Sequence, residues 1–389
     1  MMEERFSATM ILHGLGDTIG FKNGDWEFSY QKFPDYKNNL LDLRIVLELI
    51  FEFIDLGGVN GINLSGWTIS DDTLFHMAIA KSLLKFSGIL DKSESIKIKD
   101  NMIDIYNKII DDEKNNIPRL MGDTTEHSIS KWNDDSDERF LPYDKTSGGN
   151  GCAMRNLCIG LAFYGEHNRL KLIDFAITTS MFTHNHPFGF LGGLTSALFT
   201  AFAIENIPIQ NWVFKLIDIL HSDNVLKFIN TQNDDIYFNY RSFIKYWNTY
   251  IDTRFNNGVP LKTHAHTNIL FRTKYYYDNF SDNSFLGGSG ISAMIMAYDS
   301  LLDCDGKWEK LIFYAILNPG DSDTVGAIAG GLYGAIYGFG DVPKHMFTHL
   351  EEHNNLHKLG KQLYDMYYLS TNLNNKSFSK KNKKNKKKI

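Results

Sequence analysis

Four glycines recur at every fourth position near the end of the sequence, at Gly326, Gly330, Gly334 and Gly338, with alanines and a further glycine beside them. On an α-helix, positions four apart lie on one face. This stretch therefore predicts a helix with one stripe of glycines along its face, where another helix can approach very closely because no side chains intervene. Such stripes also occur in membrane-spanning helices, but this segment is short and its flanks are polar. The stripe predicts tight packing inside a globular core.

Apolar residues recur at intervals of three and four over much of the chain, whereas alternating β-branched runs bounded by turn residues are nearly absent. With 389 residues, 43% of them hydrophobic, the chain can bury a large core. The pattern therefore predicts an all-α protein. Helices are expected at residues 41–53, 73–86, 170–181, 191–204, 212–220, 291–302, 311–317, 325–337 and 350–367, and loops at the polar segments 91–101, 111–131, 230–235 and 277–284.

The C-terminal end differs sharply in composition, because residues 376–389 contain eight lysines and no acidic residue. Such a segment cannot bury enough apolar surface to fold. We expect one folded domain over residues 1–370 and a disordered Lys/Asn-rich tail over residues 371–389. The formal net charge of −6 becomes −14 for residues 1–375, so the folded body should repel nucleic acid. The tail could contact RNA or an acidic partner, serve as a nuclear address, or have no specific role.

The cysteine content and the N-terminus bear on location. Three cysteines, Cys152, Cys158 and Cys304, are too few for a disulfide framework, and the start MMEERFS lacks a secretion signal. We therefore expect an intracellular, cytoplasmic protein with no membrane partner. The longest uncharged stretch, residues 188–204, falls short of the ~20 apolar residues that a membrane span needs. It is expected to be a buried core helix.

Two acidic clusters with hydroxyl residues stand at predicted helix starts, SDDT at residues 70–73 and DSDT at residues 321–324. Serine or aspartate can cap a helix by accepting a backbone N–H. A cap needs only one acid, however, and neighbouring carboxylates repel each other unless a cation neutralises them. Carboxylate and hydroxyl oxygens suit hard cations such as Mg²⁺ rather than Zn²⁺. The residues alone leave both interpretations open, capping and metal binding.

The glycine stripe offers a way to join the two clusters. Packing the striped helix tightly against the helix that follows Asp72 would bring both acidic helix starts together. Because 250 residues separate Asp71 from Asp321, a shared site would make almost the whole chain one domain.

Two further stretches carry weaker signals. SGGNGCAMRNLCIGL, residues 147–161, runs from a glycine-rich loop into an apolar helix. Its backbone N–H groups could bind a phosphate, or the glycines could simply make a flexible helix entry. THNHPFG, residues 183–189, places His184 and His186 before a proline turn. These histidines could be ligands, a base, or hydrogen-bonded scaffold.

Six motifs occur together in one order: GLGDTIGFKNGDWEF at 14–28, SDDT at 70–73, GGNGCAMRNLCIGL at 148–161, THNHPFGFLGGLTSALFTAFA at 183–203, GGSG at 287–290 with AYD at 297–299, and GDSDTVGAIAG at 320–330. In this order they resemble the ADP-ribosylglycohydrolases over roughly residues 6–365. Any single motif would be weak evidence, but six in register are strong. The NGDWEF and AMRNLCIGL forms resemble the branch that acts on ADP-ribosylarginine rather than relatives that act on ADP-ribosylserine.

The resemblance implies a single orthogonal bundle of helices with a central metal cleft that holds two Mg²⁺ ions, for which Mn²⁺ could substitute. The metal ligands would be Ser70, Asp71, Asp72, Asp321, Asp323 and Thr324, and the catalytic residues would be Asp71, Asp72 and Glu27. ADP-ribose would contact Gly149, Asn150, Gly151, His184, Ser289 and Gly290, with Phe285 or Tyr277 as candidates for the adenine. Where the arginine branch usually carries His-Asp after SSG, this chain has Ile291-Ser292 after Gly290, so we expect the distal ribose to be positioned differently, with an effect on efficiency and leaving-group preference.

The reaction implied by the resemblance is hydrolysis of the N-glycosidic bond between ADP-ribose and an arginine guanidinium. The substrate would be an ADP-ribosylated protein or free ADP-ribosylarginine, and the enzyme a monomer. Alternatives within the same fold are hydrolysis of O-linked ADP-ribose, on serine or in O-acetyl-ADP-ribose, and a non-catalytic ADP-ribose-binding protein. A dinuclear phosphoesterase would also suit the carboxylates, but it would not explain the order of the six motifs.

Deletion of residues 376–389 is expected to leave both the melting temperature and the hydrolysis of a small substrate unchanged, because a lysine-rich tail buries no apolar surface. A melting curve and a turnover assay on the truncated protein check this. A clear fall in either would show that the tail belongs to the folded domain.

Overall fold

The computed structural model describes residues 2–32, 42–132, 140–281 and 286–369. The all-α prediction is confirmed: within these residues the secondary structure is helical apart from one antiparallel hairpin, β1 (Phe255–Asn256) with β2 (Val259–Pro260), and one isolated bridge. The helices are α1 (Met2–Phe21), α2 (Arg44–Asp55), α3 (Gly58–Gly61), α4 (Asp71–Lys85), α5 (Lys92–Lys114), α6 (Asp123–Ser130), α7 (Gly151–Arg155), α8 (Leu157–Ala162), α9 (Arg169–Ser180), α10 (Pro187–Ile204), α11 (Trp212–Leu220), α12 (Asp223–Leu226), α13 (Asp234–Arg254), α14 (His264–Thr267), α15 (Ile269–Phe280), α16 (Gly290–Asp303), α17 (Trp308–Ala315), α18 (Ser322–Tyr337) and α19 (His353–Leu363).

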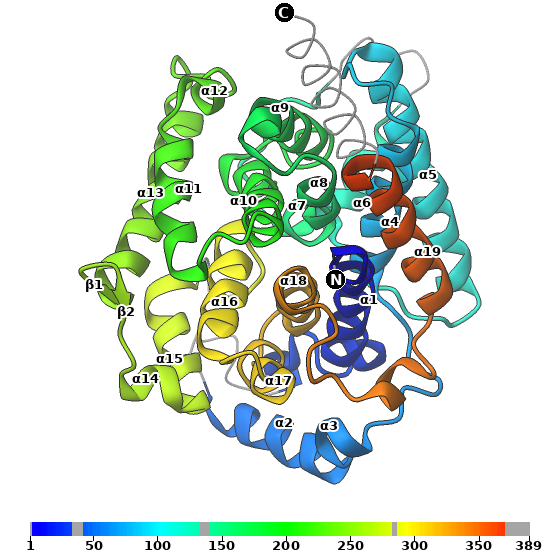
Figure 1. Ribbon diagram of the computed structural model, residues 1–389, viewed down its shortest axis with the longest axis vertical. Coiled ribbons are helices and arrows are strands. Elements are labelled where there is room, and N and C mark those ends of the chain that lie inside the picture. Colours follow the sequence, from blue (N-terminus) through cyan, green and yellow to red (C-terminus); the bar gives the residue numbers. More distant parts are fainter. Residues whose placement is uncertain (1, 33–41, 133–139, 282–285, 370–389) are drawn as a thin grey trace, which may run out of the picture.

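Two helices from opposite ends of the sequence, α1 and α18, lie side by side at the centre of the molecule (Figure 1). The glycine stripe of α18 faces α1. A Cβ atom added at Gly326 would lie 2.6 Å from the carbonyl oxygen of Gly16, and one at Gly330 would lie 2.2 Å from that of Leu12. Real Cβ atoms essentially never approach so closely. The predicted tight packing is therefore present, and it requires glycine at these positions.

The partner of the stripe differs from the expectation. The helix after Asp72, α4, contacts α18 only weakly, whereas α1 covers the stripe along its length. The two acidic helix starts still meet, because both are attached to the C-terminal half of α1. Gly20 packs directly on Ser322 at the start of α18, and Asp17 accepts hydrogen bonds from Ser70 at the start of α4.

Three long helices, α1, α5 and α13, were not among those predicted. α1 is buried on every side from Phe6 to Phe21, so it has no polar face and no amphipathic period. In α5 and α13, polar residues far outnumber the narrow buried apolar stripe. The predicted loops at 91–101 and 111–131 are wrong in large part, since they contain the start of α5 and all of α6. Those at 230–235 and 277–284 overlap the ends of α13 and α15.

Helix α10 is buried along its whole length. It is the one helix within the described ranges that is long and apolar enough to cross a membrane, and all of it lies inside the protein. His186 caps it by accepting a hydrogen bond from the backbone N–H of Phe188 at 3.0 Å. The predicted core helix is confirmed.

The AYD motif belongs to a buried ion-pair cluster in the wall formed by α13, α15 and α16. Asp299 accepts a hydrogen bond from Arg254 at 2.8 Å and also pairs with Arg272, and both arginines pair with Asp303 at 2.5 Å. The two arginines hold the pKa of Asp299 down to about 2 despite its burial. This cluster joins three helices, and none of its four residues lines the cavity at the acidic helix starts that is described below.

Candidate metal and substrate site

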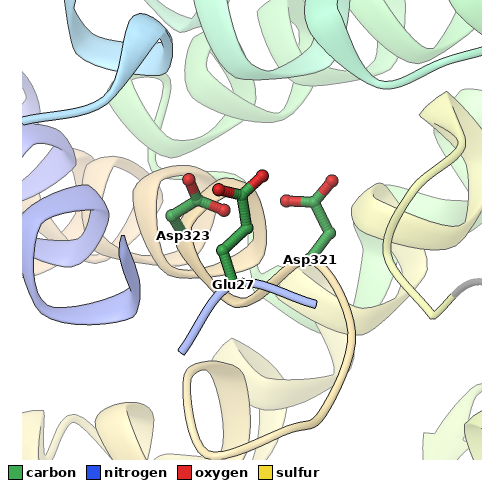
Figure 2. Close-up of side chains that lie close together, drawn as sticks. All are labelled: Glu27, Asp321 and Asp323. Carbon is green, nitrogen blue, oxygen red and sulfur yellow. The ribbon is translucent and has the colours of Figure 1, made fainter. Parts of the chain in front are cut away.

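Three carboxylates from two distant parts of the sequence converge at the start of α18 (Figure 2). One oxygen each of Glu27, Asp321 and Asp323 lie within 4.8 Å of one another. Asp321 is the N-cap of α18, and its carboxylate accepts a hydrogen bond from the backbone N–H of Thr324 at 3.4 Å. Asp323, in the first turn, accepts from the same N–H at 2.9 Å. One acid therefore caps the helix, and the second adds charge beyond what capping needs.

Glu27 reaches this cluster from a loop between two short 3-10 turns, Lys22–Gly24 and Ser29–Lys32. The loop is fixed to the segment before α18, because the backbone N–H of Phe28 donates to the carbonyl of Gly320 at 2.7 Å. The neighbouring Trp26 is fully buried. These contacts hold the Glu27 carboxylate over the start of α18.

The second acidic cluster is built differently, because Ser70 and not an aspartate caps α4. The Ser70 hydroxyl accepts a hydrogen bond from the backbone N–H of Asp72 at 3.1 Å. Asp71 accepts a long hydrogen bond of 3.4 Å from the N–H of Gly122. Oδ2 of Asp72 is buried without a hydrogen-bond partner among the described residues. Capping alone therefore does not account for Asp71 and Asp72.

A cavity of about 410 Å³ joins the two clusters and brings most of the predicted site residues together. Glu27, Asp71, Asp72, Asp321 and Thr324 line its acidic side, and Gly149, Asn150, Gly151 and His184 line another. Asp323 belongs to the carboxylate cluster at the same place. Ser70 is fully buried and does not itself line the cavity.

The glycine-rich loop is held in a defined conformation next to the acids. Gly149 forms an isolated antiparallel bridge with Ser289. The Asn150 side chain donates to the carbonyl of Gly287 and to Oδ2 of Asp321, each at 2.7 Å. A Cβ at Gly151 would lie only 2.8 Å from the ring of His184. The glycines thus make room for His184, and the loop is not merely a flexible helix entry.

A larger cleft of about 870 Å³ shares Phe28, Gln31, Asp123, Thr124, Gly149 and Gly288 with the acidic cavity. Ser289 lines it, and so do five aromatic residues, Phe28, Tyr30, Phe188, Phe238 and Tyr246. The candidate Tyr277 is wrong as a cleft residue, because it lies on α15 and lines neither space. Phe285 lies outside the described residues.

The GGSG turn and the two residues after it form a self-supporting unit. Gly290 lines neither space, but its N–H donates to the carbonyl of Gly148 at 3.1 Å and so ties this turn to the glycine-rich loop. The hydroxyl of Ser292 accepts from the N–H of Gly287 at 3.0 Å, and Ile291 is buried. Ile291 and Ser292 therefore stabilise the turn from behind.

Burial and mutual repulsion dominate the electrostatics of the acids. Burial raises the pKa of Glu27 well above its ordinary value, and the charges of Asp321 and Asp71 raise it further. The pKa values of Asp71, Asp72 and Asp323 are raised well above normal for the same two reasons, and burial also raises the pKa of Asp321. Burial lowers the pKa of His184, which is therefore neutral at neutral pH. The cavity is a place where negative charge is costly unless a cation is present.

The free energy of unfolding of the metal-free protein is expected to fall as the pH rises. The folded state favours the protonated acids, so their stabilising contribution is complete below the ordinary carboxyl pKa values of 3.8 and 4.5 and is lost as the pH rises through the raised values. Melting curves between about pH 4 and 8 in EDTA, beside curves in saturating Mg²⁺, test this. Glu27→Gln should flatten the decline in EDTA. Equal pH profiles for both proteins would contradict the expectation.

Sequence reasoning missed Asp17, which lies on α1 directly behind the SDDT turn. It is fully buried and accepts hydrogen bonds from Ser70 and Thr73. Burial raises its pKa to about 6, against the opposing effect of these hydrogen bonds. The one sign of Asp17 in the sequence was its position as a single acidic residue among the apolar residues and glycines of GLGDTIG. Gly122 and Asp123, which also line the cavity, carry no local signal.

The family model for ADP-ribosylglycohydrolase matches residues 1–372. The L444 protein of Acanthamoeba polyphaga mimivirus, named provisionally as an ADP-ribosyl glycohydrolase, is 36% identical over 90% of this chain and 68% of its own length. ADP-ribosylhydrolase ARH1 of Dictyostelium discoideum is 29% identical over 93% of this chain and 94% of its own. A solved structure titled as an ADP-ribosylglycohydrolase-related protein complex has the same fold, with a TM-score of 0.55 at 18% identity over 94% of this chain and 99% of that one. The chain belongs to the ADP-ribosylglycohydrolase family.

Proposed function

We propose that this protein is a Mg²⁺-dependent hydrolase that cleaves the N-glycosidic bond between ADP-ribose and arginine, releasing ADP-ribose and unmodified arginine. The observation that carries the proposal is that four buried or largely buried acids, Glu27, Asp71, Asp72 and Asp321, line one cavity beside a fixed glycine-rich loop, with Asp323 clustered against two of them. Membership of a hydrolase family supports the reaction class. The NGDWEF and AMRNLCIGL motifs favour arginine as the leaving group.

The residues present fit a hard divalent cation. Every donor in the cluster is a carboxylate or hydroxyl oxygen, which is the ligand type of Mg²⁺ and Mn²⁺. Within the described ranges, two carboxylate oxygens are buried without a hydrogen-bond partner, Oε2 of Glu27 and Oδ2 of Asp72. Such orphaned acceptors are costly unless something binds them. The residues that would hold two ions are Ser70, Asp71, Asp72, Asp321, Asp323 and Thr324, with Glu27 beside them.

The two connected spaces match the two ends of ADP-ribose. The acidic cavity would take the ribose that carries the scissile bond. The diphosphate would pass the glycine-rich loop, where backbone N–H groups of Gly149 and Gly151 are the available donors. The adenine would enter the larger cleft, whose aromatic side chains can stack on a base. The orientation of the whole substrate would then place the scissile bond among the carboxylates.

The carboxylates supply the chemistry at the bond. Arginine leaves as a neutral guanidine, and positive charge builds on the ribose carbon as the bond breaks. Asp71 and Asp72 would stabilise that charge at close range in a buried site. Bound Mg²⁺ would fix the ribose hydroxyls and acidify a water molecule. Glu27 or Asp72, each with an oxygen that has no hydrogen-bond partner among the described residues, would accept the proton of the attacking water.

The proposal is tested by incubating the protein with ADP-ribosylarginine and, separately, with a serine-ADP-ribosylated peptide, each in Mg²⁺, Mn²⁺ or excess EDTA. We expect ADP-ribose to be released from arginine in either metal and no release in EDTA. Release from serine alone would replace arginine by the O-linked substrate. Binding of ADP-ribose with no release from any substrate would indicate a non-catalytic protein, and full turnover in EDTA would exclude the metal.

A further inference from the structure

Within the part of the chain that the structure describes, the side chain of Asp17 on α1 hydrogen-bonds to the start of α4 alone. Its carboxylate accepts from the backbone N–H of Ser70 at 3.1 and 3.2 Å, from the N–H of Thr73 at 3.2 Å, and from the Thr73 hydroxyl. Asp71 and Asp72 lie between these two attachment points. Asp17 itself is fully buried and does not line the acidic cavity. It therefore touches the segment that carries two site acids without being in the site.

The hydrogen bonds to Asp17 satisfy backbone N–H groups of α4 that a capping box would satisfy in other helices. In an ordinary capping box the N-cap and third helical residues satisfy each other's backbone N–H groups with their own side chains. In α4 these positions are Ser70 and Thr73, and Asp17 from another helix satisfies both N–H groups. The side chains of Asp71 and Asp72, in the first turn, are thereby left out of capping. Neither of them is needed to complete the helix start.

The helix that carries Asp17 is itself fixed to the other parts of the site. Nε2 of His13, one turn earlier, lies 2.8 Å from the carbonyl oxygen of Met154 in α7, next to the glycine-rich loop. Gly16 and Gly20 pack against the backbone of α18 near Asp323. The geometry of α1 thus sets where the two acidic helix starts and the loop lie relative to one another.

We propose that Asp17 is a positioning residue that fixes the 70–73 turn so that Asp71 and Asp72 face the cavity before any ligand binds. The proposal rests on the proposed function, in which these two acids hold Mg²⁺ and stabilise the breaking bond. The turn has another attachment, because the N–H of Asp71 donates to the carbonyl of Arg119 at 3.1 Å. Loss of Asp17 should therefore loosen the turn and leave the fold in place.

The test is Asp17→Asn, which keeps the size of the side chain but presents an NH₂ group to donors that need an acceptor. The matched control is Thr18→Val, since Thr18 is also fully buried on α1, and among the described residues its hydroxyl donates only within that helix, to the carbonyl of Gly14 at 2.8 Å. The measurements are hydrogen exchange of the amides of residues 70–73 in EDTA, Mg²⁺ affinity by calorimetry, and kcat and KM for ADP-ribosylarginine. In Asp17→Asn we expect exchange at 70–73 to rise and Mg²⁺ affinity and kcat to fall, each by about tenfold or more, because hydrogen bonds to a charged acceptor are lost. Thr18→Val should match the wild type.

Several results would overturn the proposal. Unchanged exchange at residues 70–73 would do so, and so would faster exchange with wild-type Mg²⁺ affinity. A rise in exchange spread evenly over all helices would indicate a purely structural role. If the wild type binds no Mg²⁺, the proposed function fails, while the exchange data still decide whether Asp17 holds the turn. If Asp17→Asn does not fold, Thr73→Val keeps both backbone donors to Asp17 and removes the hydroxyl, which also lies 3.3 Å from Nδ1 of His13, so it should shift exchange in the same direction by less.

Discussion

Asp323→Asn is expected to lower the rate of ADP-ribose release by orders of magnitude while leaving the fold intact. The N-cap of α18 is Asp321, so the substitution keeps the cap. It removes a buried charge whose pKa is raised by burial and by Glu27 and Asp321. Loss of a metal-held orientation and of charge stabilisation costs several kcal/mol, at roughly 1.4 kcal/mol per tenfold in rate. In metal-free buffer the mutant should be as stable as the wild type or more stable, because repulsion between the acids is relieved.

Melting curves with and without Mg²⁺, beside a release assay, measure both effects. The Mg²⁺-induced rise in melting temperature should shrink in the mutant, because a ligand stabilises only in proportion to its binding to the folded state. Asp91→Asn is the matched control, since Asp91 caps α5 by accepting from the N–H of Glu94 at 2.9 Å, far from the carboxylate cluster in sequence. If Asp323→Asn behaves like this control in both assays, the aspartates are caps and the metal proposal fails.

Gly330→Ala is expected to destabilise the protein by about 2–3 kcal/mol, although alanine favours a helix by about 1 kcal/mol over glycine. The added Cβ would lie 2.2 Å from the carbonyl oxygen of Leu12. That oxygen belongs to the backbone of a helix buried on every side, so it has no room to retreat. Denaturant unfolding in EDTA measures the loss as a lower midpoint.

Gly331→Ala provides the control on the same helix. The nearest atom to its added Cβ is Cδ2 of Leu157, at 2.5 Å, and the nearest backbone atom, the carbonyl oxygen of Thr9, is 3.4 Å away. The end of a leucine side chain can change rotamer, whereas a helical carbonyl cannot. We expect a much smaller loss. If the two substitutions lower the free energy of unfolding equally, close contact between the glycine stripe and the backbone of α1 is not what makes Gly330 necessary.

The features that could be predicted from the sequence were those that depend on the spacing of residues close together in the chain. The spacing of Gly326, Gly330 and Gly334 predicted close helix packing, whereas the acids at residues 70–73 and 321–324 left capping and metal binding both open. The identity of the packing partner could not be predicted, because α1 is buried all round and leaves no amphipathic signal.

The larger cleft shows a second limit of prediction from the sequence. Its aromatic residues come from the Glu27 loop and the 3-10 turn after it, from α10 and from α13, and each looks like an ordinary core residue in its own segment. Phe238 was not a candidate, although it is 69% exposed at the edge of the cleft. Only the fold brings it near Phe28. The candidate Tyr277 failed for the converse reason, since an aromatic residue near a motif in sequence need not face the same space.

The pairing of α1 with α18 has a consequence for how the chain matures during translation. The ribosome must add the 300 residues between Phe21 and Ser322 before α18 begins to appear. At about 5–20 residues per second this takes roughly 15 to 60 seconds. Throughout that interval α1, which is buried on all sides in the folded protein, lacks its main packing partner, α18. Exposed apolar surface of this kind promotes aggregation. A nascent chain of this protein should therefore depend on a holding chaperone until its last helices are made, and a chain cut short before residue 322 should reach neither a closed core nor a complete acidic cavity.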